Sequence, residues 1–470
     1  MILLTLLIFS LIVSTAYTKN LRRSVENAPR TGKSPAQQSA PSTAQFPKFS
    51  VIVPAYNEAE NIRDCAIAIL ESTRLSVDNL EVLIVDDRST DDTLAIAQTL
   101  QQQLNDPRLK ILAGQSRPAN EYWAGKNWAC AQAVQVATGD FLLFIDADVR
   151  LKPQAIETAL ETVETEKIDL LTCMPALVCE CFAEWLVQPL MFNHLAVCFD
   201  FTAVNDPTVD SAFAAGPFML FRRSAYEKIG GHEAVAGEIV EDVELSRRIK
   251  RAGLKLGLYA GSNLAFVRMY RSWSALWEGW TKNLYLGANR SWVAMIYMAT
   301  IMLFLYPIPW IGLFIILKDL ISFFLLPSSF FLLPEFPPLG GAGGGDFFLL
   351  PEFPPLGGAG GGDFWLLPEF PPLGGAGGGD FFHLPEFPPL GGAGGGDFFL
   401  LPSSLLAIIV IWQQYNLRRL GAQISDCSTK YWWLGGLGGT LVAAIAIGSA
   451  IKTETGWGWT WRGRPLQIKT

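Results

Sequence analysis

The chain has 470 residues, of which half are hydrophobic and only 17% are charged, so it is too apolar for an ordinary soluble protein of this length. Its formal net charge of −8 comes from an internal repeat, and the remainder carries equal numbers of acidic and basic residues. This balance argues against a nucleic-acid-binding protein, which would show a basic field. The seven cysteines form no CxxC pair and lie near no histidine cluster, so we expect reduced, buried thiols rather than a zinc site.

Residues 1–18 are expected to form an N-terminal membrane anchor. No basic residue precedes this apolar stretch, whereas Lys19, Arg22 and Arg23 follow it, which is the reverse of a cleaved signal peptide. The same charge order predicts that the following chain is cytoplasmic. Residues 19–47 are rich in Ser, Ala, Pro and Gln and are predicted to be a linker.

Short apolar runs alternate with helical patterns in the next part of the chain. The predicted strands are residues 50–54, 81–87, 110–112 and 141–145, and the predicted helices are residues 59–71, 91–104 and 127–137. This alternation predicts βαβ units and a largely parallel sheet. Carboxylates follow two of the strands, at Asp86 and Asp87 and at Asp146 and Asp148, where open α/β sheets bind their ligands.

The pair Asp146 and Asp148 has two interpretations. On a strand, positions i and i+2 point the same way, and two close carboxylates are unfavourable unless a cation or a metal-bound phosphate lies between them. The alternative is two solvated acids in a loop.

Residues 151–271 show a more mixed pattern. This region contains a predicted strand at 170–174 and a predicted helix from 240 to about 252, whose first turn includes Glu241 and Asp242. Between them, residues 182–201 form an apolar helical segment. One interpretation of this segment is a membrane-facing surface. The aromatic, amphipathic residues 270–285 then predict an interfacial helix beside a membrane.

Two transmembrane regions are expected, at 291–329 and at 405–470, the second including a C-terminal tail. Between them lies a Pro/Gly-rich insert, residues 330–404, with four near-identical 17-residue repeats. The prolines and glycines disfavour a helix, so a mostly unstructured loop without catalytic residues is predicted, with a β-helix or interaction module as the alternative. Three spans after the soluble domain would place the C-terminus outside, although its basic residues favour the inside.

Four motifs, in order, resemble those of the family 2 glycosyltransferases, which are inverting enzymes with the GT-A fold. They are Val53–Glu58 (VPAYNE), Val85–Asp92 (VDDRSTDD), Asp146-Ala147-Asp148 and Glu241-Asp242. The resemblance covers residues 49–285. It implies an α/β fold, with a GT-A nucleotide-diphospho-sugar transferase domain of mostly parallel sheet at residues 48–290, plus transmembrane helices.

The resemblance also implies roles for individual residues. The donor would be a nucleotide diphosphate sugar bound by Pro54, Tyr56, Glu58, Asp86 or Asp87, and Asp146, while Asp148 would hold Mg²⁺ or Mn²⁺. Asp242 would be the general base, with its neighbour Glu241 as the closest alternative. A non-catalytic alternative exists for both residues, because acidic side chains at the N-terminus of a helix are stabilised by the helix dipole.

Two further residues have open interpretations. Lys126 precedes a predicted helix and is included among the donor-binding residues because a phosphate could bind there, but a solvated cation fits equally well. His232 lies between the Gly216 loop and Asp242 in the sequence, where an acceptor role and a structural role are both compatible.

The predicted function is the transfer of one sugar to a hydroxyl of a membrane lipid. The layout is most similar to membrane glycosyltransferases of hopanoid or carotenoid glycosylation. Processive polysaccharide synthases carry Gln/Arg-x-x-Arg-Trp where this chain has Trp277-Glu278-Gly279-Trp280, which favours single transfer. The alternatives are a polyprenyl-phosphate sugar or polysaccharide synthase, and a non-catalytic membrane scaffold. The expected location is the inner or plasma membrane, with a cytoplasmic catalytic domain; the expected partners are the donor, a lipid acceptor and the membrane, and no nucleic acid.

Overall fold

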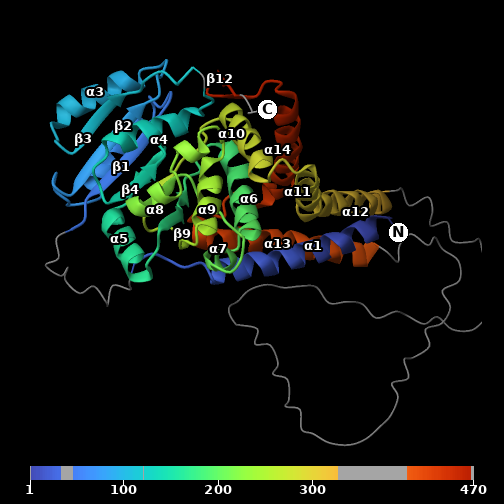
Figure 1. Cartoon of the computed structure of the whole chain (residues 1–470). Coiled ribbons are helices and arrows are strands. Elements are labelled where there is room, and N and C mark those ends of the chain that lie inside the picture. The colour runs from blue at the N-terminus through green and yellow to red at the C-terminus, as the bar shows by residue number, and fades with distance from the viewer. Residues whose placement is uncertain (1, 33–45, 120, 326–399, 467–470) are drawn as a thin grey trace, which may run out of the picture. The chain divides into compact units, whose positions relative to one another are not determined.

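The computed structural model describes residues 2–32, 46–119, 121–325 and 400–466. They form one large compact unit, Met1–Asp319 with Phe398–Thr470, and a second unit, Leu320–Asp397. Nearly all of the predicted repeat insert lies outside the described residues, so its predicted lack of structure stays a prediction. Only its last residues are described, and they lie in helix α13. The large unit is shown in Figure 1.

A seven-stranded sheet lies at the centre of the large unit, in the order β3-β2-β1-β4-β8-β6-β9. Its strands are β1 (Phe49–Ala55), β2 (Leu80–Asp86), β3 (Leu109–Ala113), β4 (Phe141–Ile145), β6 (Leu170–Met174), β8 (Phe218–Arg222) and β9 (Leu256–Ala260). Neighbouring strands run parallel except where β8 pairs antiparallel with β4 and β6. The predicted mostly parallel sheet is confirmed. A small second sheet contains β5 (Val149–Leu151), β7 (Ala176–Leu177) and β10 (Ala265–Val267).

Helices cover both faces of the main sheet, which is why its central strands are apolar throughout. One face packs against α2 (Ile62–Glu71), α3 (Thr93–Leu104) and α5 (Ala155–Glu166), and the other against α4 (Gly125–Val136), α6 (Phe182–Cys198), α7 (Phe201–Asn205), α8 (Arg223–Lys228) and α9 (Glu241–Arg251). Alternate residues of β4 enter opposite cores: Leu142 and Phe144 join one, and Leu143 and Ile145 the other. All five residues of β4 are buried.

The carboxyl ends of β1, β2 and β4 meet at one edge of the sheet, because these three strands are parallel neighbours. The loops that leave this edge carry Tyr56, Asp87 and Asp146. Asp146-Ala147-Asp148 lies in a turn between β4 and β5 rather than on the strand itself. The turn places both carboxylates at the predicted edge, where they line the same cavity.

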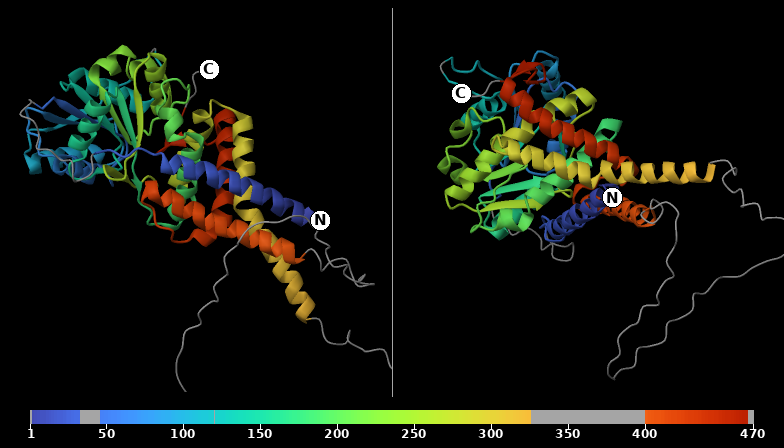
Figure 2. Two further views of the ribbon diagram at one scale, coloured as in Figure 1. Left: turned by 90° about the horizontal axis from the view of Figure 1, so that it is seen from below. Right: turned by 90° about the vertical axis from the view of Figure 1, so that its right-hand side faces the viewer.

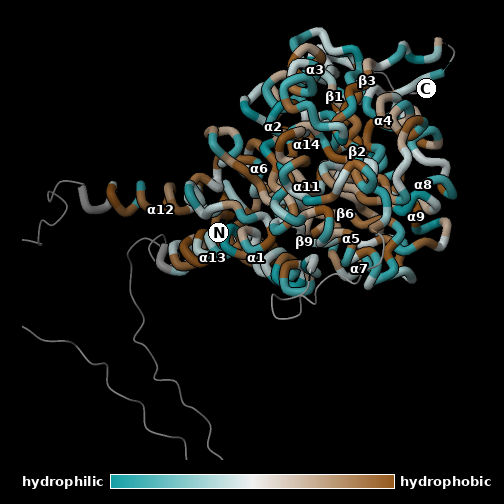
Figure 3. Tube along the Cα trace, turned by 90° about the vertical axis from the view of Figure 1, so that its left-hand side faces the viewer, coloured by the Kyte–Doolittle hydropathy of each residue, from teal (hydrophilic) through white to brown (hydrophobic). Residues whose placement is uncertain are grey.

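Long apolar helices follow and precede the sheet domain, and they pack on one another. They are α1 (Ile2–Glu26), α10 (Trp273–Gly287), α11 (Trp292–Leu305), α12 (Pro307–Leu325), α13 (Leu400–Ser425) and α14 (Gly435–Thr455). Helix α14 packs against α10, α11 and α6, and α1 packs along α13, as Figure 2 shows from two further directions. Among the described residues, three segments are long and apolar enough to cross a membrane: Ile2–Glu26, Trp292–Ser322 and Trp432–Thr455. Their apolar character is visible in Figure 3.

Two predictions about these helices need correction. Helix α1 continues to Glu26, so the first residues of the predicted 19–47 linker are helical. Its buried residues recur every three or four positions, from Leu7 to Tyr17 and Leu21, because that stripe packs on α13. Helix α6 does not present a membrane-facing surface: most of its side chains are buried between the sheet and the other helices.

The break between α11 and α12 has a local cause. Pro307 and Pro309 lack the backbone N–H groups that would continue the helix. The missing N–H of Pro309 leaves the carbonyl of Leu305 without its helical partner. The side-chain amide of Gln414 on α13 donates to this carbonyl at 3.0 Å and to the next one, that of Tyr306, at 3.1 Å. The buried Gln414 thus satisfies the backbone where the helix is interrupted, as an apolar surrounding requires.

The chain returns to the sheet domain after α14. Residues that follow this helix form a short hairpin, β11 (Thr460–Trp461) and β12 (Arg464–Pro465). Arg462 and Arg464 of this hairpin pair with Glu58 and Asp87 at the sheet edge. The hairpin and the sheet domain therefore lie on the same side of any membrane. Among the described residues, two candidate spans follow the soluble domain, and the expectation of three spans stays a prediction.

Candidate active site

A cavity of about 720 Å³ opens at the carboxyl edge of the sheet. Nine of the ten residues predicted for the site line it: Pro54, Tyr56, Glu58, Asp87, Lys126, Asp146, Asp148, Glu241 and Asp242. Asp86 does not. It is buried, and its Oδ2 accepts a hydrogen bond from the Ser89 backbone N–H at 3.1 Å. Of the two aspartates left open by the sequence, the structure brings Asp87 to the cavity and leaves Asp86 to hold the turn after β2.

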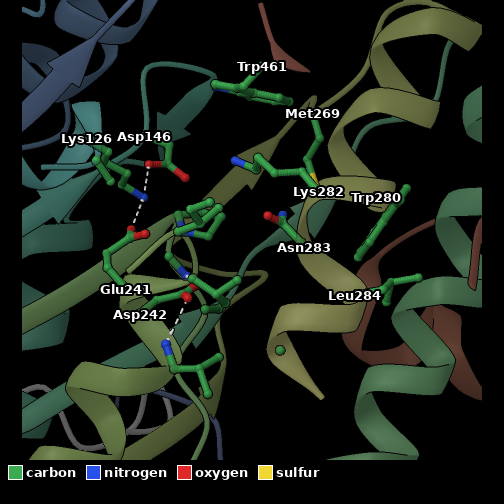
Figure 4. A pocket seen from close by; sticks show the side chains of 18 of the residues that line it. Lys126, Asp146, Glu241, Asp242, Met269, Trp280, Lys282, Asn283, Leu284 and Trp461 are labelled. Carbon is green, nitrogen blue, oxygen red and sulfur yellow. Dashed lines mark hydrogen bonds and ion pairs between the residues drawn. The ribbon is translucent and has the colours of Figure 1, made fainter. Parts of the chain in front are cut away.

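Lys126 lies at the centre of the charged end of the cavity (Figure 4). Its Nζ is 2.7 Å from Asp146 Oδ1 and 2.8 Å from Glu241 Oε1. Burial opposes the charge of the amine, but Asp146, Glu241 and Asp242 outweigh it and raise the pKa of Lys126 well above its usual range. Lys126 is thus a fixed cation that joins the β4 turn to the start of α9, and not the solvated surface residue that the sequence also allowed.

The residue after Lys126 fixes this geometry. Asn127 is fully buried, and its side-chain amide donates to the carbonyls of Val235, Ala236 and Glu238 at 2.7, 3.1 and 2.8 Å. These carbonyls belong to the loop that leads into α9. One side chain of α4 therefore holds the segment that delivers Glu241 to the neighbouring lysine.

Asp242 is held by two backbone N–H groups. Its Oδ2 accepts from Gly216 at 2.9 Å, and its Oδ1 accepts from Val243 at 2.8 Å. Burial, together with the neighbouring Glu241 carboxylate, raises the pKa of Asp242 to about 7, although Lys126 lowers it. A carboxyl group with a pKa near neutrality is suited to proton transfer. Glu241, in contrast, is buried and paired with Lys126.

Asp148 has the character of a cation ligand. Its Oδ1 is buried and has no hydrogen-bond partner among the described residues. Burial and the nearby Asp146 and Glu58 carboxylates raise the pKa of Asp148 well above its usual range. A divalent cation would supply the missing partner of Asp148 Oδ1, and its charge would favour the ionised carboxylate. The described residues contain no cluster of three or more His, Cys, Asp or Glu side chains suited to a metal, but Mg²⁺ is commonly held by one or two carboxylates plus substrate phosphates, so the residues present fit it.

The C-terminal hairpin supplies site residues that sequence reasoning missed. The Arg464 guanidinium lies 3.7 Å from the centre of the Tyr56 ring and pairs with Asp87, which also accepts from Arg117 Nη2 at 3.0 Å. Arg462 Nη2 lies 2.8 Å from Glu58 Oε1. Both arginines were noticed in the sequence only as basic residues that indicate membrane topology. The signal available was the clustering of two arginines and aromatic residues directly after an apolar helix.

The other end of the cavity is apolar. Its wall is formed by side chains of α6, α10 and α11, including Leu195, Trp280, Leu284, Met295 and Met298. These helices extend the cavity from the carboxylates to the candidate span that begins at Trp292.

Lys282 of α10 reaches into the cavity from this side (Figure 4). Its Nζ lies 4.0 Å from the centre of the Trp461 ring, and burial lowers its pKa to about 8. His232 is not part of the lining. It is buried against Phe144, with its Nδ1 2.8 Å from the Tyr226 hydroxyl, so the structure supports the structural role.

Comparison with known proteins agrees with this geometry. Residues 50–230 match the model of glycosyl transferase family 2, and residues 141–336 match that of glycosyl transferase family group 2. The sheet domain of this chain is a family 2 glycosyltransferase domain. The resemblance inferred from the four motifs is thereby confirmed.

Similar curated proteins are 4,4'-diaponeurosporenoate glycosyltransferases. This chain is 28% identical to the protein of Staphylococcus haemolyticus over 246 residues, covering 51% of this chain and 62% of the relative. It is 28% identical to the Staphylococcus aureus (strain MRSA252) protein over 262 residues, covering 55% and 66%. The match thus spans less than two thirds of these relatives' length.

Two solved structures with similarity to this chain are the following. One is a mannosyltransferase from Pyrobaculum calidifontis in complex with GDP-Man and Mn²⁺, with 20% identity, a TM-score of 0.44 and coverage of 62% of this chain and 76% of that one. The other is glucosyl-3-phosphoglycerate synthase of M. tuberculosis, with 20% identity, a TM-score of 0.36 and coverage of 56% and 86%.

Proposed function

We propose that this chain transfers one sugar from a nucleotide diphosphate sugar to a hydroxyl group of a membrane lipid, with inversion at the anomeric carbon. The observation that carries the proposal is one cavity with two chemically different ends. Carboxylates and cations line the end at the sheet edge, and apolar side chains of α6, α10 and α11 line the other. A polar donor and an apolar acceptor would meet between them. The names of the curated relatives support an acceptor of carotenoid type.

The donor would lie along the sheet edge. Tyr56 offers a ring face for the nucleobase, and the carboxylates of Glu58 and Asp87 can accept hydrogen bonds from base N–H groups and ribose hydroxyls. Asp146, next to Lys126, would contact the sugar. Mg²⁺ or Mn²⁺ at Asp148 would neutralise charge that develops on the leaving diphosphate.

Asp242 would act as the general base. Its two backbone hydrogen bonds fix the orientation of the carboxylate, and its pKa of about 7 lets it take the acceptor proton near neutral pH. As the proton leaves, the acceptor oxygen would attack the anomeric carbon from the side opposite the nucleotide. Glu241 would hold Lys126 in place rather than move a proton itself.

A second candidate is transfer to an acidic head group, such as a carboxylate or a polyprenyl phosphate. The observation that favours it is Lys282, whose amine faces the cavity and has no carboxylate partner within ion-pair distance among the described residues. A cation in this position could neutralise an anionic acceptor. For either acceptor, the enzyme would lie in the inner or plasma membrane with its catalytic domain in the cytoplasm, as the charges after α1 suggest.

The test is donor turnover by the purified full chain with a panel of UDP- and GDP-sugars, with Mg²⁺ or Mn²⁺. We expect one donor to be hydrolysed slowly alone and transferred when lipid extracts or defined hydroxylated and acidic lipids are added. Asp148→Ala should abolish turnover, whereas Asp78→Ala, at an exposed position, should not. The proposal fails if no donor is consumed and Asp148→Ala behaves like the control. A polymeric product would instead identify a polysaccharide synthase.

A further inference from the structure

The hairpin of residues 460–465 is anchored to the helix that lines the acceptor end of the cavity. Glu278 of α10 accepts from the Thr460 hydroxyl and from the Arg462 backbone N–H, at 2.5 and 3.2 Å. One α-helical turn further along, Lys282 contacts the Trp461 ring. The hairpin is therefore fixed at its base, and its two arginines extend from there over the sheet edge.

The arginines occupy the surface on which a nucleotide would bind. Arg464 stacks on the Tyr56 ring at 3.7 Å and donates to both the side chain and the backbone carbonyl of Asp87. Arg462 pairs with Glu58 and donates to the Asn57 carbonyl. A nucleobase and a guanidinium cannot stack on the same face of one ring, so Arg464 has to leave Tyr56 when a base binds there.

The chemistry of the two arginines indicates where they would go. A guanidinium binds phosphate oxygens through two parallel N–H···O bonds, and this geometry suits a diphosphate better than an ammonium does. Carboxylates released by the arginines would become free to accept from the ribose and the base. In this exchange the two arginines keep an anionic partner in both states. Asp87 keeps its ion pair with Arg117, and Glu58 would exchange an ion pair for hydrogen bonds from the nucleoside.

We propose that the hairpin of residues 460–465 is a donor-responsive lid, whose Arg462 and Arg464 exchange Glu58 and Asp87 for the diphosphate of the bound nucleotide sugar. This inference rests on the proposed function, because it needs a nucleotide sugar at the sheet edge. Since the hairpin is anchored to α10, closure of the lid acts on the same helix that carries Trp280 and Lys282 at the acceptor end.

The first test measures donor kinetics of Arg462→Ala and Arg464→Ala in the full chain. Loss of a charge-assisted hydrogen bond predicts at least about a tenfold fall in kcat/KM for the donor, mainly through KM. Arg462→Lys and Arg464→Lys should recover part of it. Arg63→Ala, at an exposed residue of α2, is the matched control and should equal the wild type. Unchanged or increased kcat/KM in both alanine variants overturns the proposal. That result would mean that the arginines only block the donor site, because removing a blocking side chain does not weaken donor binding.

The second test does not depend on turnover. Hydrogen exchange of residues 457–466 is followed with UDP or GDP plus Mn²⁺, and the same residues are compared in Arg464→Ala. We expect nucleotide to slow exchange in the wild-type hairpin and to have no such effect in the variant. Exchange that nucleotide leaves unchanged or speeds in the wild type overturns the proposal. A wild-type protein that turns over no donor contradicts the proposed function instead, so the two failures are distinguishable.

Discussion

The contact between Lys126 and the acids around it predicts a specific pH dependence. If Asp242 is the base, it works only as the carboxylate, so kcat/KM should fall as pH drops through its pKa of about 7. A single group with that pKa is about 9% ionised at pH 6 and about 91% ionised at pH 8, which predicts roughly a tenfold rise in kcat/KM across this interval.

Replacing Lys126 with glutamine should move this profile. Lys126 lowers the pKa of Asp242, while burial and Glu241 raise it. Removing the cation therefore raises the pKa further, and the rise in activity shifts to higher pH. The same change leaves Asp146 and Glu241 without their partner. Breaking a buried ion pair costs about 3–5 kcal/mol of folding free energy. For Lys126→Gln we expect a loss of about 3 kcal/mol, because the lysine side chain is 29% exposed.

The assay is kcat/KM for the donor between about pH 5.5 and pH 9, since this ratio reports groups of the free enzyme. Lys126→Arg keeps the cation and should retain the wild-type profile, while Lys48→Gln removes an exposed lysine and controls for net charge. A wild-type profile that is flat from pH 6 to 8, or a Lys126→Gln profile shifted to lower pH, would refute the reasoning.

Three further changes test separate parts of the molecule. Asp148→Asn should remove the rise in melting temperature given by Mn²⁺ and lower transfer at least about 100-fold; a variant still stabilised by Mn²⁺ would exclude Asp148 as a ligand. Gly216→Ala would place a Cβ 2.9 Å from Asp242 Oδ2, so kcat should fall about tenfold with an unchanged melting temperature, and unaltered kcat would argue against Asp242 as the base. Glu184→Gln breaks a buried pair with Arg268 at 3.0 Å and should cost about 3 kcal/mol in detergent unfolding assays, whereas a loss below about 1 kcal/mol would show that the pair contributes little.

Much of the sheet edge could be predicted from the sequence because its signals are local. Strands buried on both faces leave uninterrupted apolar runs, and the acids that follow β2 and β4 mark where those strands end. The motifs then placed Tyr56, Asp87 and Asp242 in one site, and the structure brings all three to one cavity.

Two features could not be predicted in this way. Arg464 and Asp87 are far apart in the sequence, and no local pattern links a hairpin after an apolar helix to the end of β2. Helix α6 shows the second limit, since burial inside a protein and exposure to lipid select the same apolar composition. Only the packing of α6 against α14 and the sheet domain distinguishes them.

The pairing of α1 with α13 has a consequence for synthesis in the cell. The ribosome makes α1 first, and almost the entire remaining chain before α13. Throughout that interval the stripe of Leu7, Tyr17 and Leu21, which is buried in the finished protein, lacks its main partner. Lipid or a chaperone has to cover it meanwhile, because an unprotected apolar stripe favours aggregation. Assembly of this helix pair is thus a late event, and it follows the synthesis of the sheet domain.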